Sequence, residues 1–186
     1  EALVAEKMAK IRVGDPLDLA TQVGAITTDA QNQTILSYIA QGRADGAEIR
    51  LGGEALDLGA GQFIAPTLLG GVTRDMSVAR EEIFGPVLVS MPFDTLDEAI
   101  ALANDTVYGL AASVWSADIN TALTATRRIR AGRFWVNCIM SGGPETPLGG
   151  YKQSGWGREA GMAGVEEYTQ IKTVHIDTAR RAHWIG

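Results

Sequence analysis

Apolar residues recur at helical spacing in five stretches of the chain. The predicted helices run from the first residue to near 12, from about 29 to 41, from 95 to 104, from 118 to 130 and from 161 to 167. In the second helix we expect Ile35, Leu36 and Ile39 to face the core, and in the fourth Leu123 and Ile129. The third helix opens on a capping box, which fixes its start.

Apolar runs without helical spacing predict strands between these helices. The run 87–93 is nearly continuous, which is typical of burial on both faces, and further strands are expected at 110–115 and 134–137. A short strand is expected at 48–51, and residues 63–69 should be extended, with Pro66 marking a sheet edge or a bend. Strands that alternate with helices form right-handed crossovers. The predicted fold class is therefore α/β, a parallel three-layer sheet with helices on both faces.

The chain ends on a predicted extending strand, Tyr168 to Asp177, in which Ile171 and His175 alternate with Lys172 and Val174. A lone terminal strand needs a partner sheet, and a second subunit is one way to supply it. We therefore expect a homodimer or homotetramer joined through residues 168–177.

Composition narrows the class of protein. The 186 residues suffice for one domain, and 46% hydrophobic content is that of an ordinary globular protein. A net charge of −6 argues against nucleic acid or an anionic membrane as a partner. The single cysteine favours a reducing compartment, and we expect a cytoplasmic protein. The chain starts inside a helical pattern, as a piece of something longer would.

One motif stands out, Glu81-Glu82-Ile83-Phe84-Gly85-Pro86-Val87. Gly85 and Pro86 force a turn just before a buried strand, which displays the preceding side chains at the rim of a sheet. A carboxylate there accepts hydrogen bonds from sugar hydroxyls, and a ring packs on a flat heterocycle. The alternative, with equal weight, is a solvated helix end beside a core phenylalanine.

A glycine-rich run covers residues 141–159, after the third strand of the series, where α/β folds bind ligands. It matches neither a P-loop nor the dinucleotide fingerprint. Together with 81–87, Ala103-Asn104, 108–112, Trp135-Val136-Asn137 and 168–174, it resembles the aldehyde dehydrogenase superfamily, in register over essentially the whole chain.

The resemblance implies oxidation of an aldehyde with NAD or NADP as coenzyme. A cysteine attacks the aldehyde to form a thiohemiacetal, and a thioester follows that water hydrolyses with help from a glutamate. By register this chain lacks that cysteine, that glutamate and the amino-terminal coenzyme domain. We therefore expect the isolated chain to be inactive. The expected divisions are a catalytic-domain portion 1–153, a crossing segment 154–167, and an oligomerisation strand and tail 168–186.

The resemblance also assigns residues to the coenzyme site. Glu82 matches the residue that binds the hydroxyls of the nicotinamide ribose, and Phe84 matches the one beside the nicotinamide. Glu159 matches a buried glutamate that supports the active site in some members, as part of a proton relay. The backbones of Lys152 and Gly155 match positions linked to a monovalent cation in some members.

Residues 139–148 match the loop that shapes the aldehyde pocket, with Ile139, Met140, Ser141 and Leu148 as the expected lining. This loop brings no aromatic residue for a quaternary ammonium group. Its Glu145 is the one acid, so aliphatic or amino-aldehydes are the expected substrates.

Other interpretations remain open on the sequence alone. The chain fits a non-catalytic assembly module, or a related reductase of acyl phosphates or acyl-thioesters. Cys138 is the one thiol, but it lacks a nearby histidine, and a pocket-lining or packing role is favoured over catalysis. His175 and His183 lack the spacing of metal ligands. Trp115 and Trp135 are expected in the core.

Overall fold

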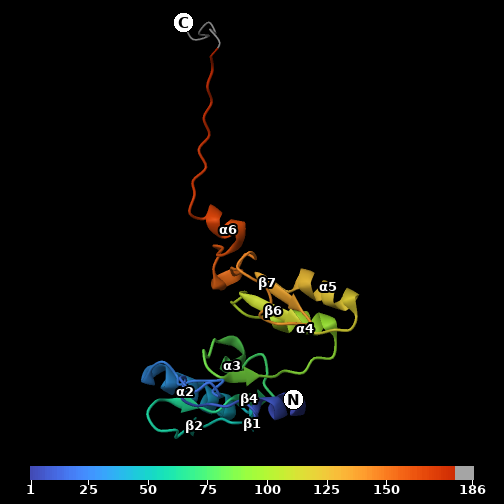
Figure 1. Ribbon diagram of the computed structural model, residues 1–186. Helices are drawn as coiled ribbons and strands as arrows, with labels where there is room; N and C mark the ends of the chain where they lie inside the picture. Colours follow the sequence, from blue (N-terminus) through green and yellow to red (C-terminus); the bar gives the residue numbers. More distant parts are fainter. Residues whose placement is uncertain (179–186) are drawn as a thin grey trace. The chain divides into compact units, whose positions relative to one another are not determined.

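The computed structural model describes residues 1–178, which divide into two compact units, Glu1–Val107 and the part from Tyr108 onward. Each unit holds its own strands and helices (Figure 1). The three divisions predicted at 1–153, 154–167 and 168–186 stay a prediction. No helix among the described residues combines the length and the apolar character needed to cross a bilayer.

The first unit contains a mixed three-stranded sheet and a two-stranded one. The strands are β1 (Glu48–Leu51), β2 (Ala55–Leu56), β3 (Phe63–Ile64), β4 (Thr67–Gly70) and β5 (Val87–Val89). The order in the larger sheet is β1-β4-β5, with β1 and β4 antiparallel and β4 and β5 parallel. The smaller sheet pairs β2 with β3, and Pro66 lies between β3 and β4.

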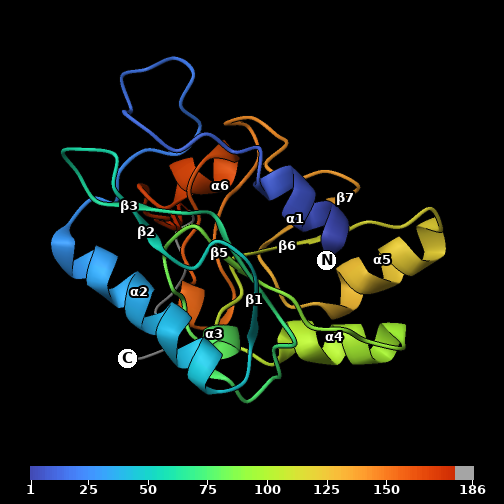
Figure 2. The same cartoon turned by 90° about the horizontal axis from the view of Figure 1, so that it is seen from below.

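Four helices belong to the first unit: α1 (Ala2–Met8), α2 (Asp29–Ala44), α3 (Ser77–Arg80) and α4 (Leu96–Asn104). The capping box of α4 is confirmed, because the amide of Glu98 donates to the Thr95 hydroxyl and the Glu98 carboxylate accepts from the amide of Asp94. Helix α2 packs on the larger sheet (Figure 2), with Ile35 and Ile39 buried as predicted.

The second unit is a strand–helix–strand crossover followed by a glycine-rich segment. Its elements are β6 (Ala111–Val114), α5 (Ile119–Arg128), β7 (Arg133–Val136), a 3-10 turn η1 (Lys152–Ser154) and α6 (Gly161–Glu166). Strands β6 and β7 pair in parallel over their whole length. The crossover predicted between them is confirmed. Past α6 the described residues form an extended segment without regular structure (Figure 1).

Three expectations need correction. The structure is mixed α/β with small sheets, and a three-layer parallel sheet is not shown. Strand β5 lies at the edge of its sheet with Leu88 46% exposed, so burial on both faces was wrong. In α5 the buried residues are Ala122 and Ala125, whereas Leu123 is exposed, because the helix sits close to its sheet through small side chains.

The tryptophans differ from one another. Trp135 is buried as expected, but Trp115, just past the end of β6, is 61% exposed. In the terminal segment Tyr168, Ile171 and Ile176 are exposed, and no strand pairing is formed by residues 168–178. His183 lies outside the described residues.

Candidate functional site

The motif at 81–87 folds as a sharp turn between α3 and β5. Ile83 is buried and anchors the turn, whereas the side chain of Glu82 is exposed and that of Phe84 is 76% exposed. Phe84 has φ 53°, a left-handed conformation that costs a non-glycine residue free energy. Both side chains are therefore displayed at the rim of the sheet, as the sequence predicted.

Helix α2 holds this turn from outside its own sequence neighbourhood. The side-chain amide of Gln31 donates to the carbonyls of Ile83 and Phe84, at 3.0 and 3.1 Å. Two consecutive carbonyls therefore point at one nitrogen, which fixes the peptide between them. The hydroxyl of Tyr38, two turns further along α2, donates to the Glu81 carboxylate at 2.5 Å. The sequence suggested that Glu81 is merely solvated, but in the structure Tyr38 holds it.

Close packing against α2 explains the glycine of the motif. A Cβ atom on Gly85 would lie 2.5 Å from Cδ1 of Ile35, which is itself completely buried. The next carbonyl, that of Pro86, accepts from the amide of Thr67 at 2.8 Å and so begins the pairing of β4 with β5. The turn is therefore fixed by packing on one side and by a sheet on the other.

Beside the turn lies a hollow of about 380 Å³, lined by Glu82 and Phe84 together with Val87, Leu88 and Val89. The carboxylate of Glu82 offers acceptors for hydroxyl groups, and the Phe84 ring and the apolar strand side chains offer a surface for a flat heterocycle. These residues fit the ribose and ring of a nicotinamide nucleotide. The structure brings together both residues predicted for the coenzyme.

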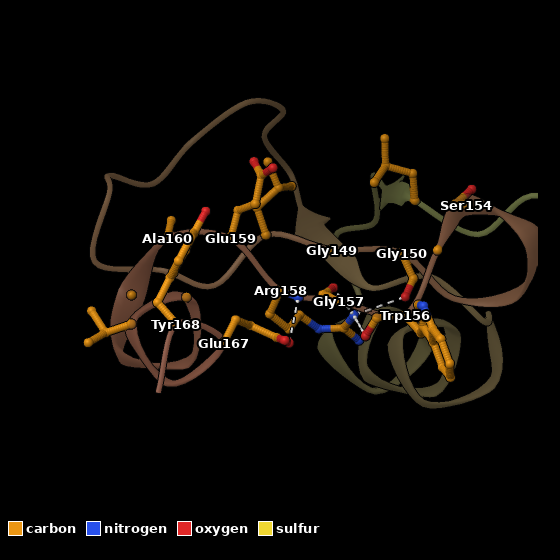
Figure 3. A pocket seen from close by; sticks show the side chains of 16 residues that line it. Gly149, Gly150, Ser154, Trp156, Gly157, Arg158, Glu159, Ala160, Glu167 and Tyr168 are labelled. Carbon is orange, nitrogen blue, oxygen red and sulfur yellow. Dashed lines mark hydrogen bonds between the residues drawn. The ribbon is translucent and has the colours of Figure 1, made fainter. Parts of the chain in front are cut away.

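In the second unit the glycine-rich segment folds back on itself. The backbones of Leu148 and Glu159 exchange two hydrogen bonds, of 2.8 and 2.7 Å, in an antiparallel bridge. Both residues line an open groove of about 810 Å³, together with Gly149, Trp156 and Tyr168 (Figure 3). A predicted pocket residue and the predicted relay glutamate are therefore neighbours. Glu159 is exposed here and not buried as the resemblance implied, so its carboxylate is accessible from the groove.

Arg158 organises the floor of this groove. One guanidinium nitrogen donates to the carbonyls of Gly150, Trp156 and Gly157, at 3.1, 3.1 and 2.8 Å. The guanidinium also lies 5.9 Å from the ring centre of Tyr151. Figure 3 shows Arg158 and Glu159 pointing in different directions. Arg158 thus holds loop carbonyls, and its backbone amide donates to the Glu167 carboxylate at 3.2 Å.

Lys152 and Gly155 are predicted through their backbones to border a cation. Lys152 begins η1, and Gly155 directly follows it. Lys152 has φ 54° and Gly155 φ 107°, and the amide of Gly155 donates to the carbonyl of Lys152 at 3.4 Å. Nearby, the Ser154 hydroxyl accepts from the amide of Gly109 at 3.0 Å, which ties η1 to the start of β6. The cation itself stays a prediction.

The predicted pocket loop leaves β7 at Asn137. Its side chains Ile139 and Met140 are 61% and 81% exposed, and Ser141 is exposed as well. These three are not among the residues that line the groove of Leu148 and Glu159. The structure therefore brings together only part of the predicted pocket set.

Cys138, between Asn137 and Ile139, is exposed, which excludes the packing role and leaves the pocket-lining role as a prediction. Throughout residues 1–178, histidine, cysteine, aspartate and glutamate side chains do not gather in threes as a metal site would require.

The sequence reasoning missed Gln31 and Tyr38. They stand four residues before and three residues after Ile35, so all three share one face of α2. A glutamine and a tyrosine on the buried face of an amphipathic helix are the signal that would have found them, because polar groups there need partners.

Comparison with known proteins gives a consistent result. A family model described as "Aldehyde dehydrogenase family" matches residues 1–174. The betaine aldehyde dehydrogenase of Brucella anthropi is 48% identical over 178 residues, which are 94% of this chain and 37% of that protein.

Solved structures agree. An NAD-dependent aldehyde dehydrogenase from Sinorhizobium meliloti is 51% identical with a TM-score of 0.94, covering 97% of this chain and 36% of that one. A betaine aldehyde dehydrogenase from Staphylococcus aureus in complex with NAD+ is 38% identical with a TM-score of 0.86, covering 90% and 34%. The chain thus spans little more than a third of the length of these relatives.

Proposed function

The chain belongs to the aldehyde dehydrogenase family, and we propose that it forms the carboxyl-terminal part of the catalytic domain of an enzyme that oxidises an aldehyde to a carboxylic acid with NAD. The observation that carries the proposal is the exposed pair Glu82 and Phe84, on a turn in which Phe84 is left-handed, beside a hollow lined by both acidic and apolar side chains. The nucleophilic cysteine and the general base would come from the rest of the complete protein.

Three residues of the chain have a defined task in this proposal. NAD, when bound, supplies the acceptor of a hydride. Glu82 accepts hydrogen bonds from the hydroxyls of the nicotinamide ribose, and the ring of Phe84 limits where the nicotinamide lies. Glu159 holds or passes a proton at its carboxylate oxygens. NAD is favoured over NADP because solved relatives are complexes with NAD+.

The names of relatives point to different substrates, betaine aldehyde and indole-3-acetaldehyde among them. A trimethylammonium group favours the faces of aromatic rings. Residues 139–148 supply Ile139 and Met140 instead, and Glu145 accepts a hydrogen bond from the Gly143 amide at 3.2 Å within the loop itself. We therefore propose uncharged aliphatic aldehydes as the better substrates, with amino-aldehydes second.

We also propose assembly through residues 168–177. Tyr168, Ile171 and Ile176 are 94%, 98% and 81% exposed. Extended backbone with exposed apolar side chains is typical of a strand that pairs with another chain. A second copy of the protein is the proposed partner.

The test is the NAD-linked oxidation of a panel of aldehydes by the complete protein that contains this chain. We expect turnover by the complete protein and none by the 186-residue chain. In the complete protein, Glu82→Gln should slow the hydride step by about tenfold, because a hydrogen bond to a charged group is worth about 1.5 kcal/mol or more.

The matched control is Glu54→Gln, which removes one exposed carboxylate from the same unit. It should leave the hydride step unchanged. Turnover by the isolated chain, or equal rates for both variants, would refute the assignment.

A further inference from the structure

Two side chains of β7 grip the pocket loop at one point. The indole nitrogen of Trp135 donates to the carbonyl of Ser141 at 2.7 Å, and a guanidinium nitrogen of Arg133 donates to the same oxygen at 3.3 Å. Arg133 and Trp135 are two residues apart on a strand and so share a face. The guanidinium carbon lies 5.2 Å from the centre of the indole ring, so the two donors also stack on each other.

The grip extends to the far end of the loop. The same guanidinium nitrogen donates to the Thr146 hydroxyl at 3.0 Å, and this hydroxyl donates to the carbonyl of Gly143 at 2.8 Å. Gly142 leaves room for the arginine, because a Cβ atom there would lie 2.6 Å from the guanidinium nitrogen. Arg133 therefore closes residues 141–146 into one hydrogen-bonded unit.

The other end of the loop is fixed as well. Asn137 has φ 55°, and its side-chain amide accepts from the amide of Ser116 at 2.8 Å and donates to the carbonyl of Ser116 at 3.0 Å. Only three residues separate this clamp from the carbonyl of Ser141. Ile139 and Met140 thus stand between two fixed points, and both side chains are exposed.

We propose that Arg133 and Trp135 are positioning residues that set aldehyde selectivity, because they fix the Ser141 carbonyl and with it the side chains of Ile139 and Met140. This rests on the proposed function, which assigns residues 139–148 to the aldehyde pocket. Loss of the anchor frees the loop, and the two apolar side chains then no longer present one defined surface to the substrate.

The first half of the test needs no catalysis. Amide hydrogen exchange of the 186-residue chain should change at Thr146, whose amide donates to Gly143 within the anchored turn. Arg133→Met removes the hydrogen-bond donors and keeps a side chain of similar length. It should speed exchange at Thr146 by about tenfold, which corresponds to the lower end of the free-energy range for a hydrogen bond to a charged group. The amide of Leu148, bonded to Glu159, should not change.

Matched variants separate the anchor from general effects. Arg127→Met removes an exposed arginine from α5 in the same unit and should leave the exchange at Thr146 unchanged. Arg133→Lys keeps the charge with a single donor group, and its exchange rate at Thr146 should lie between those of the wild type and Arg133→Met. Trp135→Phe, which removes only the indole donor, should act in the same direction as Arg133→Met and replaces it if that variant fails to fold.

The second half measures kcat and KM of the complete protein for linear and branched aliphatic aldehydes. Arg133→Met should change the ratio of kcat/KM between the two kinds by about tenfold, mainly through KM, and Arg127→Met should not. Unchanged exchange at Thr146 would overturn the anchor. Faster exchange with an unchanged aldehyde ratio would overturn its role in selectivity. A wild-type protein that oxidises no aldehyde would refute the proposed function, while the exchange data still decide the anchor.

Discussion

Replacing Gln31 by methionine should destabilise the turn at residues 81–87 without changing any residue of that turn. The substitution removes the amide that serves the carbonyls of Ile83 and Phe84 and keeps the length of the side chain. Two neutral hydrogen bonds contribute about 1 kcal/mol each to stability, and the partly exposed setting lowers this to about 1.5 kcal/mol in total. The left-handed conformation of Phe84 costs about 1–2 kcal/mol. The clamp and the strain are therefore of similar size, so the turn should relax once the clamp is lost.

Two assays follow from this balance. Urea unfolding of the isolated chain should show that Gln31→Met lowers the free energy of unfolding by about 1.5 kcal/mol. The affinity of the complete protein for NAD should fall by about tenfold, because only the left-handed turn is competent to bind. The matched control is Gln33→Met, at an exposed position of the same helix. The reasoning is refuted if Gln31→Met and Gln33→Met have equal stability and equal affinity.

Three further predictions concern packing, pH and assembly. Gly85→Ala should cost about 1–3 kcal/mol of unfolding free energy, measured in urea, because its Cβ meets the buried Ile35; a cost equal to that of an exposed site would contradict the packing. The pKa of the Asp118 carboxyl is lowered chiefly by the Thr121 hydroxyl, then by the amides of Thr121 and Asn120, so its contribution to stability is present above the unfolded pKa and is lost as the pH falls through the lower folded one. Below about pH 4, the free energy of unfolding should therefore fall less with decreasing pH in Asp118→Asn than in the wild type. An equal fall in both proteins would argue against Asp118 as the N-cap of α5. Removal of residues 168–186 from the complete protein should lower its mass in light scattering to that of one subunit, and an unaltered oligomer would exclude this segment as the contact.

The turn at 81–87 was predictable from the sequence because its signals are local. Gly85 and Pro86 restrict their own backbone, and the acid and ring precede them directly. The partners in α2 were not predictable in the same way. Gln31 lies 52 residues from Ile83, and only folding shows which carbonyls its amide serves.

The prediction of buried residues failed where small side chains or an edge strand decide which residues are buried. Leu123 has the size of a core residue, yet Ala122 and Ala125 face the sheet because α5 lies close to β6. Leu88 belongs to an apolar run, yet β5 ends its sheet. Apolar patterns report the tendency of a segment to be buried, and the neighbouring element decides which side chains achieve it.

The central claim is that Glu82 accepts hydrogen bonds from the nicotinamide ribose. The most direct test is a double-mutant cycle in the complete protein, with Glu82→Gln as one change and an NAD analogue without the hydroxyls of the nicotinamide ribose as the other. The account predicts that the wild-type protein loses at least about fivefold more affinity with the analogue than Glu82→Gln does. Equal losses in both proteins would mean that Glu82 does not contact these hydroxyls.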